Sequence, residues 1–221
     1  MSAWLNLLQQ SRLIAVIRSD RSSVAREMAL AVAAGGIRLM EITWNTDKVE
    51  TLIPKLQQEL PACRIGTGTI LNAEMAKRAI ACGCSFFFTP HTEPELIEMG
   101  QSANVPVIPG AMTPTEIIRA WQAGASAVKV FPIKILGGVE YLKTLAPVIP
   151  QIPLIPTGGV TLENAQQFLE AGAIAVGIAS SLFQQSSDDL DWANLISRAQ
   201  SLVEKLQPYQ TSPNTIPKQE Q

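Results

Sequence analysis

Two charged residues stand inside segments that are otherwise typical of buried β-strands. Glu41 lies at the centre of Leu39–Thr43, and Lys129 lies at the centre of Ala127–Phe131. Parallel strands are covered on both faces, so a charge in the middle of one is costly unless it has a partner or a task. Because side chains alternate along a strand, aliphatic neighbours that face surrounding helices would leave both charges pointing into a barrel. We expect the two groups to meet near the C-terminal mouth of that barrel.

A buried lysine opposite a buried carboxylate could carry out Schiff-base chemistry. Removal from water lowers the pKa of a lysine, which leaves part of it as the neutral amine that attacks a ketone carbonyl. A nearby carboxylate can move the protons that this reaction requires. The same two residues could instead form a structural ion pair that fills the barrel. The neighbouring motifs favour Lys129 as nucleophile and Glu41 as general acid/base, with Lys134, just past the same strand, as the competing lysine.

Glycine-bearing loops after two later strands indicate a site for phosphate or a similar oxyanion. One loop contains Thr157, Gly158 and Gly159 and leads into a helix, and the other is Gly177–Ser181. Backbone N–H groups at such turns cradle anions, and the loops after strands seven and eight of α/β barrels often bind phosphate. We therefore expect these two loops to form an anion site.

Two further loops add polar groups at the expected mouth. Gly66–Asn72 follows the third strand; its glycines would let the backbone approach a ligand, and Thr69 offers a hydroxyl. Phe88–His91 ends the fourth strand. His91 is the single histidine of the chain, and we interpret it as a loop residue rather than as the catalytic base.

Short apolar or β-branched segments recur roughly 20 to 26 residues apart, as repeated βα units require. Such a repeat predicts a parallel eight-stranded TIM barrel, with an open doubly wound sheet as the alternative. The predicted strands are Leu13–Arg18, Arg38–Thr43, Cys63–Thr67, Phe86–Thr89, Val105–Pro109, Ala127–Phe131, Pro153–Pro156 and Ile174–Ile178.

Helices are predicted between the strands, and several have start and stop signals. Asn72 and Thr113 stand where capping residues are wanted, and glycines follow several helices at the positions where a left-handed residue ends them. Residues 1–207 are expected to form one domain, with a capping helix at Trp4–Gln10 and a last helix at Asp188–Leu206. The polar, proline-containing segment 208–221 is expected to be a disordered tail. The glycines are Gly35, Gly83, Gly124 and Gly172, and the clearest helices are Ser22–Ala34, Asp47–Leu60, Asn72–Cys82, Thr113–Ala123 and Thr161–Ala171.

The composition narrows the possible functions. Hydrophobic residues make up 47% of the 221 residues and charged residues 16%, as in a compact enzyme, and the net charge is −2 without any basic run. We expect no nucleic-acid partner and, because no leader or long apolar stretch is present, no membrane association and a cytoplasmic location. Three cysteines fit a reducing compartment better than a disulfide framework. The expected chemistry uses no metal and no cofactor.

Taken together, the motifs resemble the KDPG/KHG aldolase family from about Leu13 to Phe183. This resemblance implies a TIM barrel, a homotrimer, and metal-free cleavage of 2-keto-4-hydroxy acids to pyruvate and an aldehyde. The segments that carry the resemblance are Leu39–Thr43, Gly66–Thr69, Val107–Gly110, Val128–Pro132, Gly137–Gly138 and Pro156–Gly159.

Transferred residue by residue, the resemblance implies Lys129 as the Schiff-base lysine and Glu41 as the general acid/base. Thr69 would hold the pyruvate part of the substrate, with Pro90 at the rim, and Phe131, two residues after the lysine, would also bind substrate. Thr157, Gly158, Gly159 and Ser180 would line the distal phosphate site.

Two positions depart from the family pattern. The phosphogluconate-cleaving members have an arginine four residues after the glutamate that binds the substrate carboxylate, whereas this chain has Asn45, as in the phosphogalactonate-cleaving branch. An asparagine cannot clamp a carboxylate with two charged hydrogen bonds. The second departure is Lys134, which lies in a bulky loop and could supply a positive charge.

The sequence thus predicts a class I aldolase that acts on a small 2-keto acid. The substrate would be 2-keto-3-deoxy-6-phosphogluconate, its galactonate analogue or 4-hydroxy-2-oxoglutarate, and the aldehyde product glyceraldehyde 3-phosphate or glyoxylate. A phosphate-sugar isomerase or epimerase would share the anion site without needing an imine. A ligand-binding barrel with a structural Glu41–Lys129 pair is the third alternative.

Overall fold

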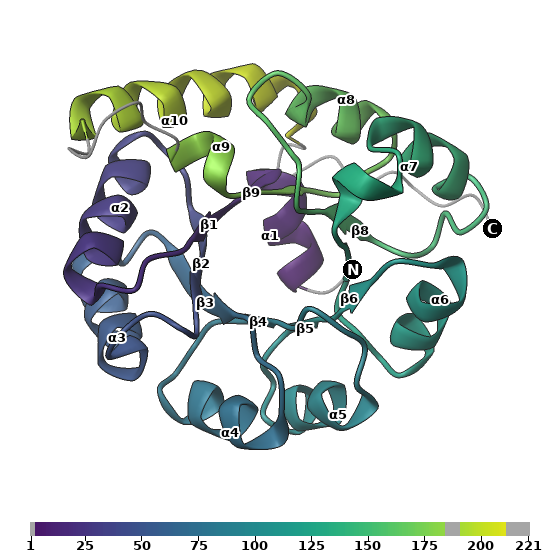
Figure 1. Ribbon diagram of the computed structural model, residues 1–221, viewed down its shortest axis with the longest axis horizontal. Coiled ribbons are helices and arrows are strands. Elements are labelled where there is room, and N and C mark those ends of the chain that lie inside the picture. The colour runs from purple at the N-terminus through teal and green to yellow at the C-terminus, as the bar shows by residue number, and fades with distance from the viewer. Residues whose placement is uncertain (1–2, 184–190, 211–221) are drawn as a thin grey trace.

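The computed structural model describes residues 3–183 and 191–210, and its strands form a ring with most helices around the outside (Figure 1). Every strand pair is parallel. The eight predicted strands are all present, most of them shortened, and a further short strand, β6, follows the fifth one. The strands are β1 (Leu13–Ile17), β2 (Leu39–Thr43), β3 (Arg64–Gly68), β4 (Phe87–Phe88), β5 (Val107–Ile108), β6 (Gly110–Ala111), β7 (Val128–Val130), β8 (Leu154–Pro156) and β9 (Val176–Ile178).

Helices follow most strands and pack against the outer face of the ring. The capping signals act as predicted at two of them: the side chain of Asn72 accepts from the Met75 N–H, and Thr113 forms a capping box with Glu116. The helices are α1 (Ala3–Ser11), α2 (Ser22–Ala34), α3 (Val49–Glu59), α4 (Ala73–Ala81), α5 (Pro94–Ser102), α6 (Pro114–Gln122), α7 (Val139–Leu145), α8 (Ala165–Glu170), α9 (Ser180–Phe183) and α10 (Trp192–Leu206), with 3-10 turns η1 (Ile133–Leu136) and η2 (Gln207–Tyr209).

The prediction of a closed eight-stranded barrel is wrong. The strands form a six-stranded sheet in the order β5-β4-β3-β2-β1-β9 and a three-stranded sheet in the order β6-β7-β8. One interruption lies at Pro109, the last residue of the predicted fifth strand, which is followed directly by β6. Val107 and Ile108 pair with β4, whereas the carbonyl of Pro109 accepts from the Lys129 N–H of β7 at 2.9 Å. The chain therefore changes partner at this proline.

The second interruption lies between β8 and β9. One isolated bridge, Thr157 to Gly177, and one hydrogen bond, from the Ile174 N–H to the Leu154 carbonyl at 3.0 Å, connect them. Backbone groups alternate in direction along a strand, so Pro156 lies on the same edge of β8 as Leu154. Proline has no N–H to donate towards β9, which prevents a continuous ladder. The fold is an interrupted α/β barrel rather than a closed one.

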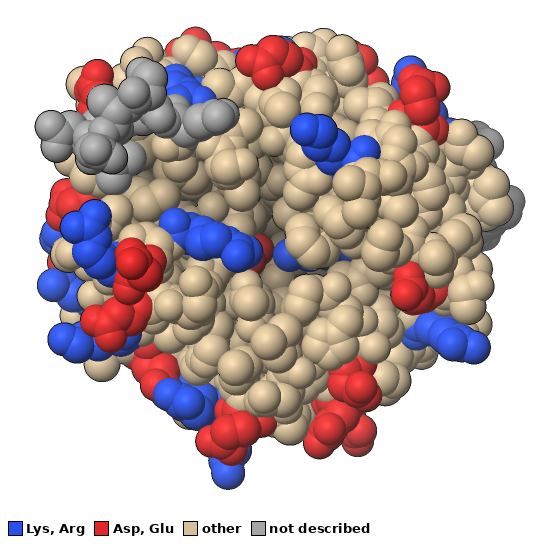
Figure 2. Space-filling model, in the orientation of Figure 1, with Lys and Arg blue, Asp and Glu red and all other residues tan. Residues whose placement is uncertain are grey.

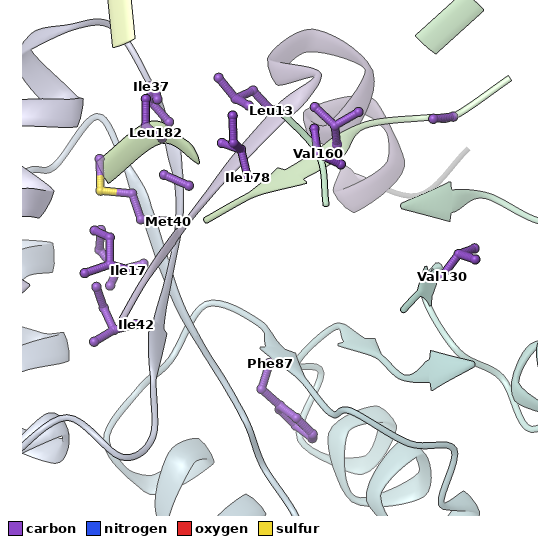
Figure 3. Close-up of a cluster of buried hydrophobic side chains, with 14 of the residues drawn as sticks. Leu13, Ile17, Ile37, Met40, Ile42, Phe87, Val130, Val160, Ile178 and Leu182 are labelled. Atoms are coloured by element: carbon purple, nitrogen blue, oxygen red, sulfur yellow. The ribbon is translucent and has the colours of Figure 1, made fainter. Parts of the chain in front are cut away.

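Two hydrophobic clusters lie on the two faces of the ring. The outer cluster, between strands and helices, contains Met40, Ile42 and Val130, which point away from the interior in Figure 3. The inner cluster fills the ring. It consists of Trp4, Leu8, Ile14, Leu39, Phe86, Phe88, Ile108, Ala127, Ile155 and Ala175. Alternation along β2 and β7 therefore directs Glu41 and Lys129 inwards, as the sequence predicted.

Helix α1 covers the end of the ring at which the strands begin. Its Trp4 and Leu8 belong to the inner cluster, and the Trp4 ring lies 4.9 Å from the Phe86 ring, centroid to centroid. Trp4 and Leu7 also line a surface pocket with Ser85, which immediately precedes the fourth-strand segment. The strand ends that carry the candidate site therefore lie at the opposite, uncovered end of the ring.

The last described residues are held against the body of the protein. The Tyr209 hydroxyl donates to the Glu170 carboxylate at 2.5 Å, and the Tyr209 carbonyl accepts from Arg12 at 2.7 Å. Ordered contacts thus extend into the start of the segment that was predicted as a tail, and residues 211–221 lie outside the described part. Residues 184–190, at the predicted start of the last helix, are also outside it. Within the described residues, no helix is long and apolar enough to cross a membrane.

Glycines end several helices as predicted, with one shift in position. Gly83, Gly124 and Gly172 have positive φ angles, but Gly36 rather than Gly35 is left-handed after α2. Gly35 serves packing instead, because a Cβ there would lie 2.5 Å from that of Ala199 on α10. The first glycine of this pair lets two helices approach closely, and the second turns the chain.

Replacing Leu8 with Ala is expected to lower the free energy of unfolding by about 2–5 kcal/mol. Leu8 is fully buried in the inner cluster, so its removal leaves a cavity beneath α1. Urea unfolding followed by circular dichroism measures the change. Asn6→Ala, on the exposed side of the same helix, should stay within about 0.5 kcal/mol of the wild type. Equal effects of the two substitutions would contradict the role given to α1.

Candidate active site

Glu41 is buried inside the ring against a glycine of the neighbouring strand. Its side chain is 1% exposed, and its Oε2 atom has no hydrogen-bond partner among the described residues. Gly68 lies beside it on β3, where a Cβ would stand only 1.8 Å from Glu41 Oε1. Real side chains do not approach so closely, so the carboxylate occupies the space that the missing side chain leaves. Because Gly68 has no side chain, it leaves the room in which the Glu41 carboxylate lies.

Lys129 lies on β7 between aromatic side chains. It is 6% exposed, and its Nζ atom lies 4.6 Å from the centroid of the Phe131 ring and 5.5 Å from that of Phe88. Cation–π attraction of this kind is worth about 0.5–2 kcal/mol, which is less than the cost of moving an ammonium ion out of water. Phe131, predicted from the sequence, thus lies beside the lysine, and Phe88 is a neighbour that sequence reasoning missed.

Burial shifts both ionisable groups towards their neutral forms. It raises the pKa of the Glu41 carboxyl, and the charges of Lys129 and Arg18 lower this pKa only in part. It likewise lowers the pKa of the Lys129 amine, an effect that Glu41 opposes and Arg18 reinforces. Glu41 and Lys129 interact electrostatically, but their charged atoms do not form an ion pair within 4.0 Å. The geometry therefore does not support the alternative of a structural ion pair.

Arg18 is a functional candidate that sequence reasoning missed. It follows β1, and it shares the inward side of that strand with Ile14 of the inner cluster and with Val16, which pairs with Glu41. Its charge acts on both Glu41 and Lys129, and its side chain is exposed. The signal in the sequence was present: a charge two residues beyond the register position of Glu41 must emerge at the same end of the ring.

The opening of the ring can be followed on the surface of the molecule. Figure 2 shows a hollow at the centre of this face, where basic and acidic side-chain atoms lie close to one another among uncharged residues. The same centre is surrounded by the strands in Figure 1. A site of this shape can take a small molecule from water and place it against buried charged groups.

The Thr157–Gly159 loop closes one side of the opening. Thr157 is buried, and its hydroxyl lies over Gly177, where a Cβ would stand 2.4 Å from Oγ1. Gly158 and Gly159 have φ angles of 79° and 123°, conformations that other residues rarely adopt. The N–H groups of Gly159 and Val160 have no acceptor among the described residues, so they can bind an anion.

The loop after β7 packs directly onto these glycines. A Cβ on Gly158 would lie 2.8 Å from the Phe131 ring, and one on Gly159 would lie 2.3 Å from the Cβ of Lys134. The two loops also share backbone hydrogen bonds, including one from the Lys134 N–H to the Gly158 carbonyl at 3.0 Å. Lys134 itself is exposed, so it lacks the desolvation that an imine-forming lysine needs.

The remaining predicted residues lie at the strand ends, less buried than the central pair. Thr69 and Pro90 follow the neighbouring strands β3 and β4 and are half-buried; Thr69 has a left-handed φ of 65°. Ser180, at the start of α9, and Asn45, after β2, are both exposed. The structure therefore brings these residues to the open end of the ring, but it records no contact between Asn45 and the buried pair.

Thr43 is another residue that sequence reasoning missed. It is fully buried two positions after Glu41 on the inward side of β2, and its hydroxyl has no hydrogen-bond partner among the described residues. A buried hydroxyl without a partner is costly, and a ligand or water can satisfy it. The alternation that identified Glu41 could have identified Thr43 as well.

Comparison with known proteins identifies a family for the chain. The chain matches the family described as KDPG and KHG aldolase over residues 5–197. It is 34% identical over 200 residues to the 2-dehydro-3-deoxy-phosphogluconate aldolase of Pseudomonas aeruginosa, a match that covers 90% of this chain and 91% of that protein. It is also 34% identical over 174 residues to the 2-dehydro-3-deoxy-6-phosphogalactonate aldolase of Escherichia coli, covering 78% of this chain and 84% of that one.

Solved structures show the same likeness in three dimensions. The KDPG aldolase of Legionella pneumophila, determined with pyruvate captured as a covalent carbinolamine, superposes with a TM-score of 0.76 at 26% identity. The match covers 94% of this chain and 98% of that chain. With a family match over residues 5–197 and relatives at this identity, the chain belongs to the KDPG and KHG aldolase family and is an aldolase, a carbon–carbon lyase.

Proposed function

We propose that this aldolase acts through a Schiff base on Lys129, with Glu41 as the general acid/base, on a 2-keto-4-hydroxy acid. The observation that carries the proposal is the buried pair itself: both groups are held inside the ring without an ion pair, and burial favours the neutral form of each. A neutral amine is a nucleophile and a protonated carboxyl is an acid, which are the two states that imine formation needs first.

The reaction begins at the keto carbon of the substrate. The neutral Lys129 amine attacks C2, and the resulting carbinolamine is neutral. The protonated Glu41 carboxyl then gives its proton to the carbinolamine hydroxyl, which leaves as water and produces the protonated imine. Glu41 is now a carboxylate next to a cation, so it is prepared to accept a proton.

Carbon–carbon cleavage uses the imine as the electron sink. Glu41 removes the proton of the C4 hydroxyl, the C3–C4 bond breaks, and the aldehyde leaves while the electron pair passes into the imine to form an enamine. Return of the proton from Glu41 to C3 regenerates the imine, and hydrolysis releases pyruvate and the free amine. Glu41 thus transfers the proton in dehydration, in cleavage of the C3–C4 bond and in protonation of C3.

Two charged or polar regions can recognise the ends of the substrate. Arg18, which directly follows the C-terminal end of β1, can pair with the substrate carboxylate. Asn45 carries no charge and cannot form such a charged pair. Thr69 and Pro90 would bound the pyruvate part. The Thr157–Gly159 loop and Ser180 would receive a distal phosphate. We therefore favour a phosphorylated sugar acid over 4-hydroxy-2-oxoglutarate.

Membership of the aldolase family removes the support for an isomerase, an epimerase or a non-catalytic barrel. The relatives named above act on phosphogluconate and phosphogalactonate derivatives, and the absence of an arginine at position 45 fits the second group. The homotrimer that the resemblance implied remains a prediction.

Treatment with pyruvate and borohydride is expected to label Lys129 irreversibly. Borohydride reduces the imine to a stable secondary amine, which peptide mass spectrometry locates. Lys129→Met should remain unlabelled and inactive, whereas Lys134→Met should be labelled as the wild type is. Label on any other lysine, or none on the wild type, would contradict the assignment.

Gly68→Ala is expected to lower kcat by about 10²–10⁴, the usual contribution of a general acid/base. The added methyl would have to occupy the space of the Glu41 carboxylate. Gly68 lies in a regular strand, so the alanine does not strain the backbone and acts through this collision. Steady-state kinetics of Gly68→Ala, Glu41→Gln and the double variant measure the effect. If Gly68 acts only through Glu41, the double variant should be no worse than Glu41→Gln alone, and additive losses would contradict this role.

Glu41→Gln is expected to gain stability relative to the wild type as the pH rises. Burial raises the pKa of Glu41 in the folded chain, so the folded state binds this proton more tightly than the unfolded state does. The contribution of Glu41 to stability is therefore full below the unfolded pKa and is lost as the pH rises through the folded one. Urea unfolding from about pH 4 to about pH 8 measures the difference. The exposed Glu98→Gln is the control; a difference that shrinks with pH would refute the account.

A further inference from the structure

We infer that Lys134 is the cationic residue that binds the distal phosphate of the substrate and makes this aldolase prefer phosphorylated keto acids. The inference rests on the function proposed above, and it adds a residue to the site that the glycine loop provides. Neither the family resemblance nor the matches assign this position. The inference has three grounds. Lys134 is fixed to the glycine loop, the loops of the anion site contain no other charged residue, and the glycine loop itself is neutral.

The attachment of Lys134 to the glycine loop is close and direct. Its backbone N–H donates to the Gly158 carbonyl at 3.0 Å, and its Cβ lies 2.3 Å from the position that a Gly159 Cβ would occupy. The preceding residue is held in the same way, because the Ile133 N–H donates to the Thr157 carbonyl at 2.9 Å. Lys134 is therefore fixed at its base to the loop that presents its free N–H groups.

The charge of Lys134 has no competitor on the loops of the anion site. The segments Val130–Gly138, Leu154–Thr161 and Val176–Phe183 contain no other charged residue. Lys134 forms no ion pair within the described part of the chain. Arg198, on α10, donates to the Ser181 carbonyl.

A phosphate group needs more than the neutral glycine loop provides. A phosphate monoester carries about 1.5 to 2 negative charges at neutral pH, and backbone N–H groups offer only partial positive charge. A lysine on a flexible stem can bring a full charge to such a group, as phosphate-binding lysines do elsewhere. The Lys134 side chain is exposed, so a ligand entering from water can reach it.

This arrangement predicts a preference that depends on the substrate's phosphate and on this lysine together. A phosphorylated substrate gains a charged hydrogen bond at Lys134, and an unphosphorylated analogue gains none. The effect should appear mainly in KM, because the distal group does not change during bond cleavage and is held equally before and during it.

The test compares Lys134→Met with Lys143→Met on a phosphorylated 2-keto-3-deoxy sugar acid and its unphosphorylated analogue. Lys143, exposed on α7 and paired with Glu140, is the matched control. We expect Lys134→Met to lose about 10- to 100-fold in kcat/KM on the phosphorylated substrate, mostly through KM, and to change less than about twofold on the analogue. Inorganic phosphate should inhibit the wild type competitively and Lys134→Met less, and Lys134→Arg should restore part of the loss.

Three results would overturn the inference: a loss shared equally by both substrates, no loss on either, or a wild type that does not discriminate between them. Failure of the proposed function is recognised separately, because pyruvate and borohydride label the Lys129 imine without any phosphate present. A wild type that is labelled, together with an unaffected Lys134→Met, would refute the role of Lys134 and leave the aldolase mechanism standing.

Discussion

The site depends on the burial of two ionisable groups that do not neutralise each other through contact. Taking a lysine and a glutamate out of water costs several kcal/mol for each charge unless they pair closely or become neutral. Here Glu41 and Lys129 are almost fully buried inside the ring and form no ion pair, and burial shifts the pKa of each towards its neutral form. In the proposed mechanism these shifts favour the neutral lysine as nucleophile and the protonated glutamate as acid. Arg18, at the exposed end of β1, adds to this effect on the lysine and opposes it on the glutamate.

Space for Glu41 and for two other side chains inside the ring comes from glycines on the inward side of the strands. A side chain on Gly68 would collide with Glu41, one on Gly177 with Thr157, and one on Gly66 with Phe86. Such glycines leave the strands less well filled than the Val- and Ile-rich strands of an ordinary core, and the prolines at 109 and 156 remove backbone donors at the two interruptions of the ring. The prolines interrupt the barrel, and the glycines leave space for inward side chains. Both kinds of residue replace regular strand packing near the open end of the ring.

The sequence predicted the parts of the structure that follow from local patterns. Alternation placed Glu41 and Lys129 inside, the eight parallel strands were located, and Asn72 and Thr113 cap helices as expected. The closed barrel was not correct, because closure depends on backbone donors of strands that are distant in sequence, and Pro156 shows its effect only once β9 lies beside it. Arg18 and Thr43 could have been found from the alternation along β1 and β2, whereas the contact of Phe88 with Lys129 depends on how β4 and β7 are placed in the ring. The left-handed Gly36, rather than Gly35, depended on the packing of α10.

Burial lowers the pKa of the Lys129 amine, and the proposed mechanism depends on the neutral form that this shift favours. Nuclear magnetic resonance of protein labelled in its lysine side chains can titrate this amine directly, with Lys129→Met identifying its signal. The account predicts a pKa well below that of the exposed lysines, and a further decrease in Glu41→Gln, since the glutamate raises the lysine pKa. A Lys129 signal that titrates together with the exposed lysines would contradict the account.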